Sequence, residues 1–449
     1  MTVRPAGLPE PIVRDPNPGF LRAVLHGAYD LLWSAGIVVA SPWWVGRSCI
    51  DRPFRRMVLE RLTFGLERTI PAAERPRILI HGVSVGEVKA AQPLVALLRA
   101  ECPQFEIVIS TTTDTGVEVA GKLFPDLRVV RFPVDLSFLD ARFLRRVRPA
   151  CVVLMELEIW PNFLREANRA GVPLCVVNGR ITQGSFGHYR FFRTTLPQFN
   201  RMTLFCAQNE RYAQRFIELG RCAERVVVTG NIKADGLQIG AVDPGEELRR
   251  IAGPRPGQPT IVAGSTHEPE ERLFIEACRA GVPDARVIVV PRHPNRAREV
   301  VRDLEALGVR PQLLTRLRSR GEEPDPTRPL IVDTIGELEQ IYGLADLVFV
   351  GGSLIPHGGQ NMLEPAAHEK PVLFGPHVAN FRQEAQLLID AGAGRTVADG
   401  EALAAVLREL CADAEARAAM ARAGIRAVEA QRGAARVTLQ ALRERCLES

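Results

Sequence analysis

Residues 351–376 read GGSLIPHGGQNMLEPAAHEKPVLFGP, a glycine-rich loop that lies between two apolar runs. The run 347–350 enters the loop, residues 360–361 open a short helix, and Glu364 falls in or near the first turn of that helix. The second apolar run, 371–374, follows at once. This pattern predicts a strand, a glycine loop, a helix and a second strand.

The predicted loop and helix would place free backbone N–H groups and the positive end of a helix at one edge of a sheet, where an anion can bind. The carboxylate of Glu364 can accept hydrogen bonds from sugar hydroxyls. We therefore expect residues 351–376 to bind the phosphate and the sugar of a nucleotide-activated sugar.

The overall composition is that of an ordinary globular protein with a weak positive charge. The chain has 449 residues, which is too long for one ordinary domain, so we expect two. Its 57 Lys and Arg residues exceed its 52 Asp and Glu residues by five. We therefore expect no nucleic-acid partner and at most a bias toward anionic substrates or anionic lipid.

The nine cysteines are scattered singly along the chain, with no CxxC pair and no Cys/His cluster. A zinc site usually shows closely spaced Cys or His ligands, so we expect no metal. Cys151, Cys175 and Cys206 lie in apolar runs and are expected to be buried thiols. This cysteine usage is typical of a protein in a reducing cytosol.

A segment near the start of the chain has the composition of a membrane anchor. Residues 31–46 carry no charge and hold three of the four tryptophans. Several arginines follow them: Arg47, Arg52, Arg55, Arg56 and Arg61. A complete span needs about 20 apolar residues, so this run is short for one. We expect a membrane-associating helix on the cytoplasmic side; the alternative is a buried helix that covers the first domain.

Short apolar runs alternate with amphipathic stretches in both halves of the chain, as is typical of a parallel sheet with helices on both faces. In the first half we expect strands at 78–81, 107–111, 128–132, 151–155, 174–178, 203–207 and 226–229. In the second half we expect them at 260–263, 286–290, 312–314, 329–332, 347–350 and 371–374. The predicted fold is α/β, with two doubly wound Rossmann-like domains that face each other across a cleft.

The same pattern divides the chain into five parts. An anchor with its basic flank (1–61) precedes the first α/β domain (62–239). A stretch rich in Gly, Pro and charge (240–259) is expected to be a linker, and the second α/β domain (260–430) follows it. We expect residues 431–449 to form a helix that could cross back to the first domain.

Carboxylates follow two predicted strands of the first domain. Glu87 comes shortly after the strand 78–81 and could take a proton from a sugar hydroxyl, or it could only complement the dipole of the helix that begins there. Glu156 and Glu158 follow the next such strand and could hold an acceptor or shift each other's pKa. They could equally pair with nearby arginines, or cap the helix that Pro161 begins.

Other polar residues at predicted strand ends suit anions. Arg180 and Lys233 could bind a phosphate or an anionic acceptor, although an ion pair for the first and a solvated side chain for the second are the alternatives. Ser265 lies in a small-residue turn that could form an anion nest, and Arg292 could bind phosphate or stack on a base. The backbone near Gly336 could recognise the edge of a nucleobase.

These motifs occur in one order along the chain: HGVSVGE (81–87), ELEIWPN (156–162), VNGRI (177–181), GNIK (230–233), AGSTH (263–267), PRHP (291–294) and NMLEP (361–365). In this combination the chain resembles the 3-deoxy-D-manno-octulosonic acid (Kdo) transferases of lipopolysaccharide assembly, glycosyltransferases of the family 30 type. The resemblance extends from about residue 78 to residue 381.

The resemblance implies a GT-B fold and an activity. Such an enzyme would transfer Kdo from CMP-Kdo to the glucosamine disaccharide of a lipid A precursor (lipid IVA), by direct displacement with inversion. The first domain would bind the acceptor and the second the CMP-sugar. The family generally uses no metal or cofactor and works at the cytoplasmic face of the inner membrane.

The resemblance also implies roles for individual residues. Glu87 would be the base, while Glu156 and Lys233 would stabilise the transition state. The contacts to CMP would be Pro291, Arg292, Gly336, Glu337, Leu338, Asn361, Met362, Leu363 and Glu364. One position departs from the family: Gln360 stands where a histidine is usual, so donor affinity or its pH dependence could differ.

Two other functions fit the same motifs less well. The chain could be another GT-B enzyme, such as a sugar-nucleotide epimerase or a transferase of a different sugar. It could also be a catalytically silent binding module at a membrane, although carboxylates at 87 and 156 together with a lysine at 233 argue against that.

Overall fold

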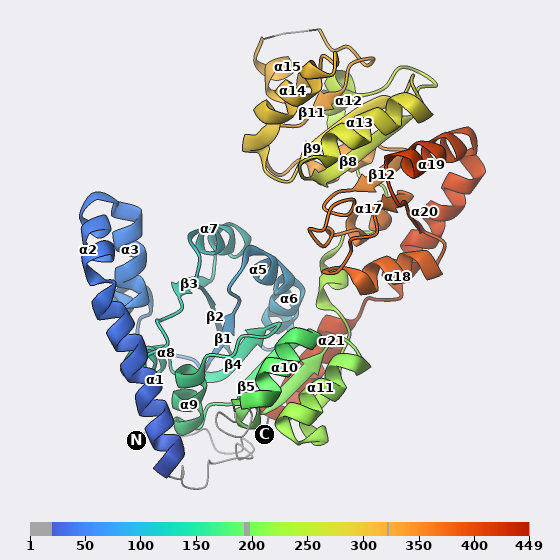
Figure 1. Ribbon diagram of the computed structural model, residues 1–449. Coiled ribbons are helices and arrows are strands. Elements are labelled where there is room, and N and C mark those ends of the chain that lie inside the picture. The colour runs from blue at the N-terminus through green and yellow to red at the C-terminus, as the bar shows by residue number, and fades with distance from the viewer. Residues whose placement is uncertain (1–19, 193–197, 321–322, 449) are drawn as a thin grey trace. The chain divides into compact units, whose positions relative to one another are not determined.

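The computed structural model describes residues 20–192, 198–320 and 323–448 (Figure 1). They form two compact units. The first unit contains the described residues up to Gly236 together with those from Arg432 onward, and the second contains the described residues of Leu237–Gln431. Each unit is an α/β domain built on a parallel sheet of seven strands.

The sheet of the first unit has the order β3-β2-β1-β4-β5-β6-β7. Its strands are β1 (Arg77–His81), β2 (Glu106–Thr111), β3 (Arg128–Arg131), β4 (Pro149–Met155), β5 (Leu174–Gly179), β6 (Leu204–Ala207) and β7 (Val226–Val228). All seven strands expected in the first half are confirmed. The order grows outward from β1 in one direction up to β3 and then resumes on the other side at β4, which is the arrangement of doubly wound folds.

The described helices of the first unit include four that precede its first strand, and the others come after it in the chain. They are α1 (Phe20–Val39), α2 (Ser41–Ile50), α3 (Arg52–Arg61), α4 (Leu66–Thr69), α5 (Val85–Ala90), α6 (Gln92–Glu101), α7 (Asp114–Leu123), α8 (Ser137–Val147), α9 (Pro161–Arg169), α10 (Gln183–Phe192), α11 (Glu210–Gly220) and α21 (Ala434–Leu442). Shorter turns are η1 (Gln198–Arg201), η2 (Ala223–Arg225), η3 (Ile232–Gly236) and the π-helical η5 (Arg443–Leu447).

The sheet of the second unit has the order β10-β11-β9-β8-β12-β13-β14. Its strands are β8 (Thr260–Thr266), β9 (Arg286–Pro291), β10 (Gln312–Leu313), β11 (Leu330–Ile331), β12 (Leu347–Val350), β13 (Val372–Phe374) and β14 (Gly394–Thr396). The six expected strands are confirmed. Strand β14 was missed because its three residues, Gly-Arg-Thr, carry no apolar run.

The helices of the second unit lie between its strands and continue after the last one. They are α12 (Gly245–Ala252), α13 (Glu270–Gly281), α14 (Ala297–Ala306), α15 (Leu314–Arg320), α16 (Leu338–Leu344), α17 (Leu363–Ala367), α18 (Arg382–Asp390), α19 (Gly400–Ala412) and α20 (Ala414–Glu429), with one short turn, η4 (Pro294–Arg296).

Both faces of the first sheet are buried, and alternate residues of each strand supply them. Ile78 and Ile80 pack into the core on one face of the sheet, while Leu79 between them packs into the core on the other. Strand β4 divides in the same way between its odd and even positions, since Val153 joins the first core and Val152 the second. A strand buried on both faces can expose polar groups only where it ends.

The expected linker at 240–259 is wrong. This stretch contains α12, whose Leu248 and Ile251 are buried in the core of the second unit. Gly and Pro residues on both sides of the helix gave the stretch a loop-like composition, which concealed an amphipathic helix of eight residues.

The segment from Arg432 onward packs on the first unit. Leu439 and Leu442 of α21 are buried in the same core as Ile78. The carboxylate of Asp235 accepts hydrogen bonds from the backbone N–H groups of Gly433 (2.5 Å) and Ala435 (2.6 Å), which anchors the start of the helix. The chain therefore leaves the first unit after Gly236 and returns to it after the second.

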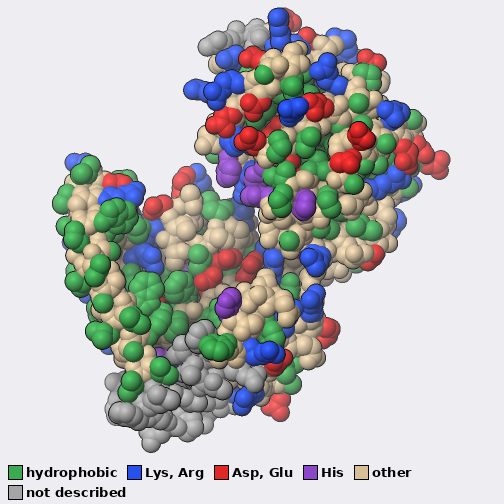
Figure 2. Space-filling model, viewed as in Figure 1, with side chains coloured by type: hydrophobic (Ala, Val, Ile, Leu, Met, Phe, Trp, Pro, Cys, Tyr) green, Lys and Arg blue, Asp and Glu red, His purple; other side chains and the backbone are tan. Residues whose placement is uncertain are grey.

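The N-terminal helices expose apolar side chains, which Figure 2 shows along α1, α2 and α3. These side chains include Leu31, Leu32, Val38, Val39, Trp43, Val45 and Ile50. No single helix among the described residues is long and apolar enough to cross a membrane. The pair Val24–Val39 and Ser41–Ile50 meets the criterion only together, with a bend of 52° at the break.

Candidate active site

Strand order gives each sheet one place where adjacent strands send their following segments to opposite faces, and such places bind ligands in doubly wound folds. In the first sheet this switch point lies between β1 and β4. The segment after β1 leads to Glu87, and Glu156 directly follows β4. The two carboxylates singled out in the sequence therefore come from the two strands that border the switch point.

Glu87 is held at the start of α5 by a capping box. Its own N–H donates to the Ser84 hydroxyl (3.3 Å), and its carboxylate accepts from the backbone N–H groups of Val83 (2.5 Å) and Ser84 (3.3 Å). The capping alternative is thus realised in the structure. Burial raises the pKa of Glu87, the charge of Glu156 raises it further, and the hydrogen bonds oppose the rise. A fixed carboxylate of raised pKa is a stronger base than a solvated one.

Glu156 is paired with Lys233, and these are the two residues to which the family resemblance gives a role in stabilising the transition state. The Lys233 ammonium donates to a Glu156 carboxylate oxygen at 2.5 Å, and both side chains are partly exposed. The backbone of Glu156 has a φ of 59°, a left-handed conformation that is costly for a residue with a side chain. Backbone strain of this kind is concentrated at functional sites.

The motif VNGRI holds the motif GNIK in position. The side-chain oxygen of Asn178, at the end of β5, accepts from the backbone N–H of Ile232 (3.1 Å), the neighbour of Lys233. Arg180 follows β5 and is half-buried, and it makes no ion pair with any residue that the structure describes. Its strand lies next to β4, so Arg180 leaves the sheet at the same edge as Glu156.

Glu158 is a third carboxylate of this group, and the family resemblance implied no role for it. Burial and the charges of Glu87 and Glu156 raise its pKa to about 8, although the Trp160 indole donates to it at 3.0 Å. The sequence signal was present, since Glu158 lies two residues beyond Glu156. What the sequence did not show is that Glu87 is close enough to Glu158 to raise its pKa.

Aromatic rings support the segment that carries these carboxylates. The ring centroids of His81 and Phe132 lie 3.9 Å apart, and those of Phe132 and Trp160 lie 5.7 Å apart. Complete burial lowers the pKa of His81 to about 3, so this histidine is neutral at physiological pH. Its role is therefore to pack and to position, through the Ser110 hydroxyl at 3.0 Å, the strand end before Glu87.

The switch point of the second sheet lies between β8 and β12. Ser265 lies at the end of β8 with a φ of 56°, and the glycine-rich loop follows β12. A Cβ atom on Gly351 would come within 2.6 Å of the Ser265 carbonyl oxygen. Only glycine therefore permits the two backbones to approach so closely at this edge.

The expectation of free N–H groups in the glycine loop is wrong. The buried carboxylate of Glu270 accepts from the backbone N–H groups of Gly352 (2.6 Å), Ser353 (2.9 Å) and Leu354 (2.9 Å). It also accepts from His267 N–H at 3.0 Å. An internal anion thus occupies the nest that we expected for a phosphate. No sequence pattern indicated this contact, because Glu270 precedes the loop by more than 80 residues.

The residues 361–364 divide into two kinds. Asn361 donates to the Glu364 carboxylate (3.0 Å) and accepts from Leu363 N–H (3.1 Å), so the two polar side chains are fixed relative to each other. The side chains of Met362 and Leu363 are buried in the core of the second unit. These two can contact a ligand only through their backbone.

The remaining donor candidates lie at further strand ends of the second unit. Pro291 ends β9, and the Arg292 side chain after it is exposed. Gly336 has a φ of 93°, and Leu338 begins α16. The Glu337 carboxylate is engaged by Arg318 at 2.5 Å, which leaves its backbone for recognition.

Gln360 belongs to a cluster of imidazoles, visible as the histidines that gather on the second unit in Figure 2. Its amide lies 3.1 Å from the His267 ring nitrogen Nε2. The rings of His267 and His357 have centroids 3.9 Å apart, and His293 lies 6.2 Å from His267. Burial and the neighbouring imidazoles His357 and His293 lower the pKa of His267 to about 4.

Comparison with known proteins identifies the family. The family model described as 3-deoxy-D-manno-octulosonic-acid transferase (kdotransferase) matches residues 57–236. A 3-deoxy-D-manno-octulosonic acid transferase of Haemophilus influenzae is 34% identical over 77% of this chain and 81% of the relative. One of Bordetella pertussis is 36% identical over 73% of this chain and 78% of the relative.

The chain belongs to the Kdo transferase family. It is therefore a glycosyltransferase. Among solved structures, a UDP-N-acetylglucosamine 2-epimerase described as putative, from Listeria monocytogenes, has a TM-score of 0.58 at 15% identity and covers 84% of this chain and 98% of its own. A glycosyltransferase of Rickettsia africae has a TM-score of 0.56 at 13% identity and covers 84% of this chain and 100% of its own. These likenesses confirm the GT-B fold class of two Rossmann-like domains.

The raised pKa of Glu158 predicts a pH-dependent effect of Glu158→Gln. The folded protein binds the Glu158 proton more tightly than the unfolded chain does. The contribution of Glu158 to the free energy of unfolding therefore falls as pH rises from about 4.5 to about 8. Glutamine does not ionise. The free energy of unfolding of the variant, relative to the parent protein, should therefore increase across this window and stay constant above it.

Unfolding in urea, followed by tryptophan fluorescence at several pH values, measures this difference. All four tryptophans belong to the first unit, so the signal reports on the unit that contains Glu158. The exposed Glu210→Gln serves as the control for the change in residue type. A difference that is flat or falls with pH would contradict the environment described for Glu158.

The Glu270 carboxylate predicts a local effect of Glu270→Ala on the glycine loop. Removal of the carboxylate leaves several buried N–H groups without an acceptor, which costs about 3 kcal/mol or more. Hydrogen exchange of the amides at 352–354 should accelerate by about a hundredfold. Glu268→Ala removes an exposed carboxylate two residues away and should leave this exchange unchanged. Equal exchange in the two variants would refute the role of Glu270.

Proposed function

We propose that this Kdo transferase uses CMP-Kdo as its donor and a lipid A precursor, lipid IVA, as its acceptor, with Glu87 as the general base. The observation that supports this most strongly is the group formed by Glu87, Glu156 and Lys233 at the β1/β4 switch point. Each residue has the chemistry that the reaction requires at that edge. The relatives from Haemophilus influenzae and Bordetella pertussis are named 3-deoxy-D-manno-octulosonic acid transferases, which supports Kdo as the transferred sugar.

The proposed step is a direct displacement at the anomeric carbon of Kdo. The acceptor hydroxyl oxygen forms the new bond, the bond from that carbon to the phosphate oxygen breaks, and its electron pair leaves with CMP. The hydroxyl proton passes to Glu87. Because burial and the charge of Glu156 raise the pKa of Glu87, the carboxylate holds that proton more strongly than a solvated glutamate would.

Lys233 and Glu156 act as a pair in this proposal. The ammonium of Lys233 offsets the negative charge of Glu156 at 2.5 Å and remains partly exposed to a ligand. A preorganised positive donor that meets developing negative charge lowers a barrier by about 3 kcal/mol. Arg180 at the end of β5 adds a second cation at the same edge of the sheet.

The second unit would hold the donor. The exposed guanidinium of Arg292 suits the phosphate or the base of CMP. The fixed pair Asn361 and Glu364 suits ribose hydroxyls, and the backbone at 336–338 suits the base edge. Glu270 already accepts from the backbone N–H groups of the loop, so side chains such as Arg292 would have to bind the phosphate of the donor. The hydroxyl of Ser265 could donate a further hydrogen bond to it. Gln360 contacts His267 without adding charge.

The N-terminal helices would attach the enzyme to the cytoplasmic face of the inner membrane. Apolar side chains are exposed along α1 and α2, among them Trp43 at 62% and Ile50 at 88%. Arginines of α2 and α3 follow them in the chain, and a cationic flank favours anionic lipid. The acceptor is embedded in lipid, so attachment would keep the enzyme at the surface where its acceptor lies.

Glu87→Gln tests the assignment of the base. The variant keeps the shape of the side chain and one acceptor oxygen for the capping box, but it cannot take a proton. Transfer of Kdo from CMP-Kdo to the lipid A precursor should fall by about 10²–10⁴-fold, while CMP still raises the melting temperature. Glu118→Gln, an exposed change on α7, is the matched control. Turnover near the parent rate would remove Glu87 from this role.

Trp43→Ser combined with Ile50→Ser tests the membrane contact without removing a buried side chain. Co-sedimentation with vesicles that contain anionic phospholipid should fall, because each change removes exposed apolar surface worth about 1.5–3 kcal/mol when buried. Ile335→Ser, which removes an 87% exposed isoleucine of the second unit, should leave co-sedimentation unchanged. Equal loss in both variants would show that α1 and α2 are not the contact.

A further inference from the structure

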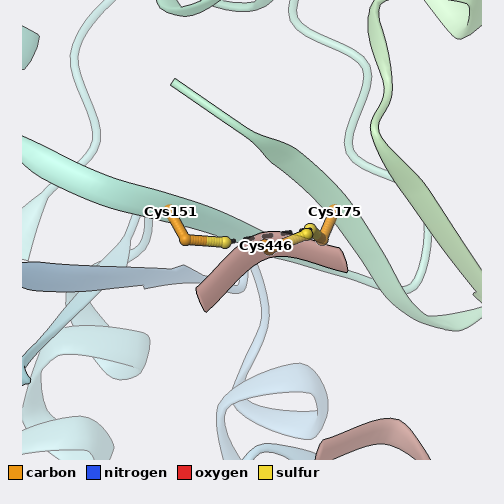
Figure 3. Close-up of side chains that lie close together, drawn as sticks. All are labelled: Cys151, Cys175 and Cys446. Carbon is orange, nitrogen blue, oxygen red and sulfur yellow. Dashed lines mark hydrogen bonds between the residues drawn. The ribbon is translucent and has the colours of Figure 1, made fainter. Parts of the chain in front are cut away.

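Three cysteines meet in the core of the first unit, on one face of its sheet. Cys151 comes from β4, Cys175 from β5 and Cys446 from η5, and their side chains point toward one another (Figure 3). The sulfur atoms of Cys151 and Cys175 lie 3.8 Å apart, and those of Cys175 and Cys446 lie 3.0 Å apart. All three sulfurs lie within 4.8 Å of one another. We call these residues the thiol triad.

The spacing of the thiol triad fits one shared ion. Sulfurs that bind one ion at about 2.3 Å lie about 3.8–4.0 Å from each other in a trigonal or tetrahedral arrangement. The pair Cys151 and Cys175 already has this separation. The pair Cys175 and Cys446 would have to open by roughly 1 Å to reach it. Neither strand needs to move, because Cys446 belongs to the segment that packs on the sheet.

The local backbone supports a special role for Cys446. Residues 443–447 form a single π-helical turn, a rare conformation that is frequent at functional sites. This turn brings the Cys446 sulfur, which is completely buried, against the sulfur of Cys175. A cysteine that served only as a small apolar side chain would not require such a turn.

The number and charge of the ligands select the class of ion. Among the described residues, no fourth His, Cys or carboxylate joins the thiol triad, whereas structural zinc takes four ligands. A monovalent cation carries less charge into the apolar core than a divalent one, so fewer thiols must lose their protons to avoid the cost of a buried charge.

We propose that Cys151, Cys175 and Cys446 form a binding site for a soft monovalent d¹⁰ cation, with copper(I) as the representative ion. Thiolate sulfur is the ligand that copper(I) prefers in proteins. The bound ion would join β4, β5 and the returning segment from Arg432 onward. Within that segment, Cys446 lies 271 positions after Cys175 in the sequence. Thiol protons displaced by the ion would pass to water.

The sequence could not reveal this site, and the proposal departs from our expectation of no metal. Zinc signatures rely on cysteines a few positions apart, whereas these lie 24 and 271 positions apart. Only the adjacency of β4 and β5, together with the return of the chain to the first unit, brings them together.

The test uses the full chain in a parent variant without accessible thiols. Cys49, which is exposed, and Cys222 and Cys411, which are half-buried, are replaced by serine in this parent. Copper(I) is supplied as its bicinchoninate complex under argon, and loss of the complex's colour measures the transfer of copper to the protein. The parent should withdraw one copper(I) per chain, and its melting temperature by tryptophan fluorescence should rise.

Single replacements in the parent locate the site. Cys175→Ala and Cys446→Ala should each abolish both the withdrawal of copper and the rise in melting temperature. Cys278→Ala, which changes a buried cysteine of the second unit, should retain both. Circular dichroism establishes that each variant is folded. If Cys175→Ala does not fold, the site is located from the copper withdrawal by Cys446→Ala and from the change in the parent's melting temperature.

Several outcomes would overturn the proposal. Copper withdrawal that is absent in the parent, or undiminished in Cys446→Ala, excludes the thiol triad as the site. Uptake of zinc(II) in preference to copper(I) under the same conditions excludes the assigned class of ion. A melting temperature that copper(I) does not change would show that the ion does not join the three segments.

Discussion

Burial of both faces of two parallel sheets is the constraint on which the rest of the structure depends. Strand β4 is almost entirely inaccessible to solvent, so polar side chains of this part of the chain can reach a ligand only after the strand ends, beginning with Glu156. The strand order then determines which strand ends can border a ligand site. The segments that follow two neighbouring strands turn to opposite faces of the sheet only between β1 and β4, and between β8 and β12. Glu87, Glu156, Ser265 and the glycine loop all lie at these two places.

Three carboxylates, Glu87, Glu156 and Glu158, gather at the first switch point beside the ammonium of Lys233. The charge of Glu156 raises the pKa of both Glu87 and Glu158, and the Lys233 ammonium pairs with Glu156. The pKa values of Glu87 and Glu158 are both raised, that of Glu158 to about 8. In the second unit a buried carboxylate, Glu270, has a different task, since it fixes the backbone of the glycine loop from within.

The sequence predicted the strands and the residues at their ends well, because both depend on local patterns. Continuous apolar runs marked every strand longer than three residues, and the motifs that followed them placed Glu87, Glu156 and Lys233. Features that depend on distant neighbours were missed. Glu270 reaches a loop more than 80 residues away, the pKa of Glu158 depends on Glu87, and the thiol triad depends on the returning segment.

The most direct measurement is the mass of the lipid product. Purified protein is incubated with a tetra-acylated lipid A precursor and CMP-Kdo, and in parallel with a UDP-N-acetylhexosamine. With CMP-Kdo, the lipid should gain the mass of one or more Kdo residues and CMP should be released in equal amount. The UDP-sugar should leave the lipid unchanged. An unmodified lipid with CMP-Kdo, or a lipid that gains an N-acetylhexosamine instead, would contradict the proposed function.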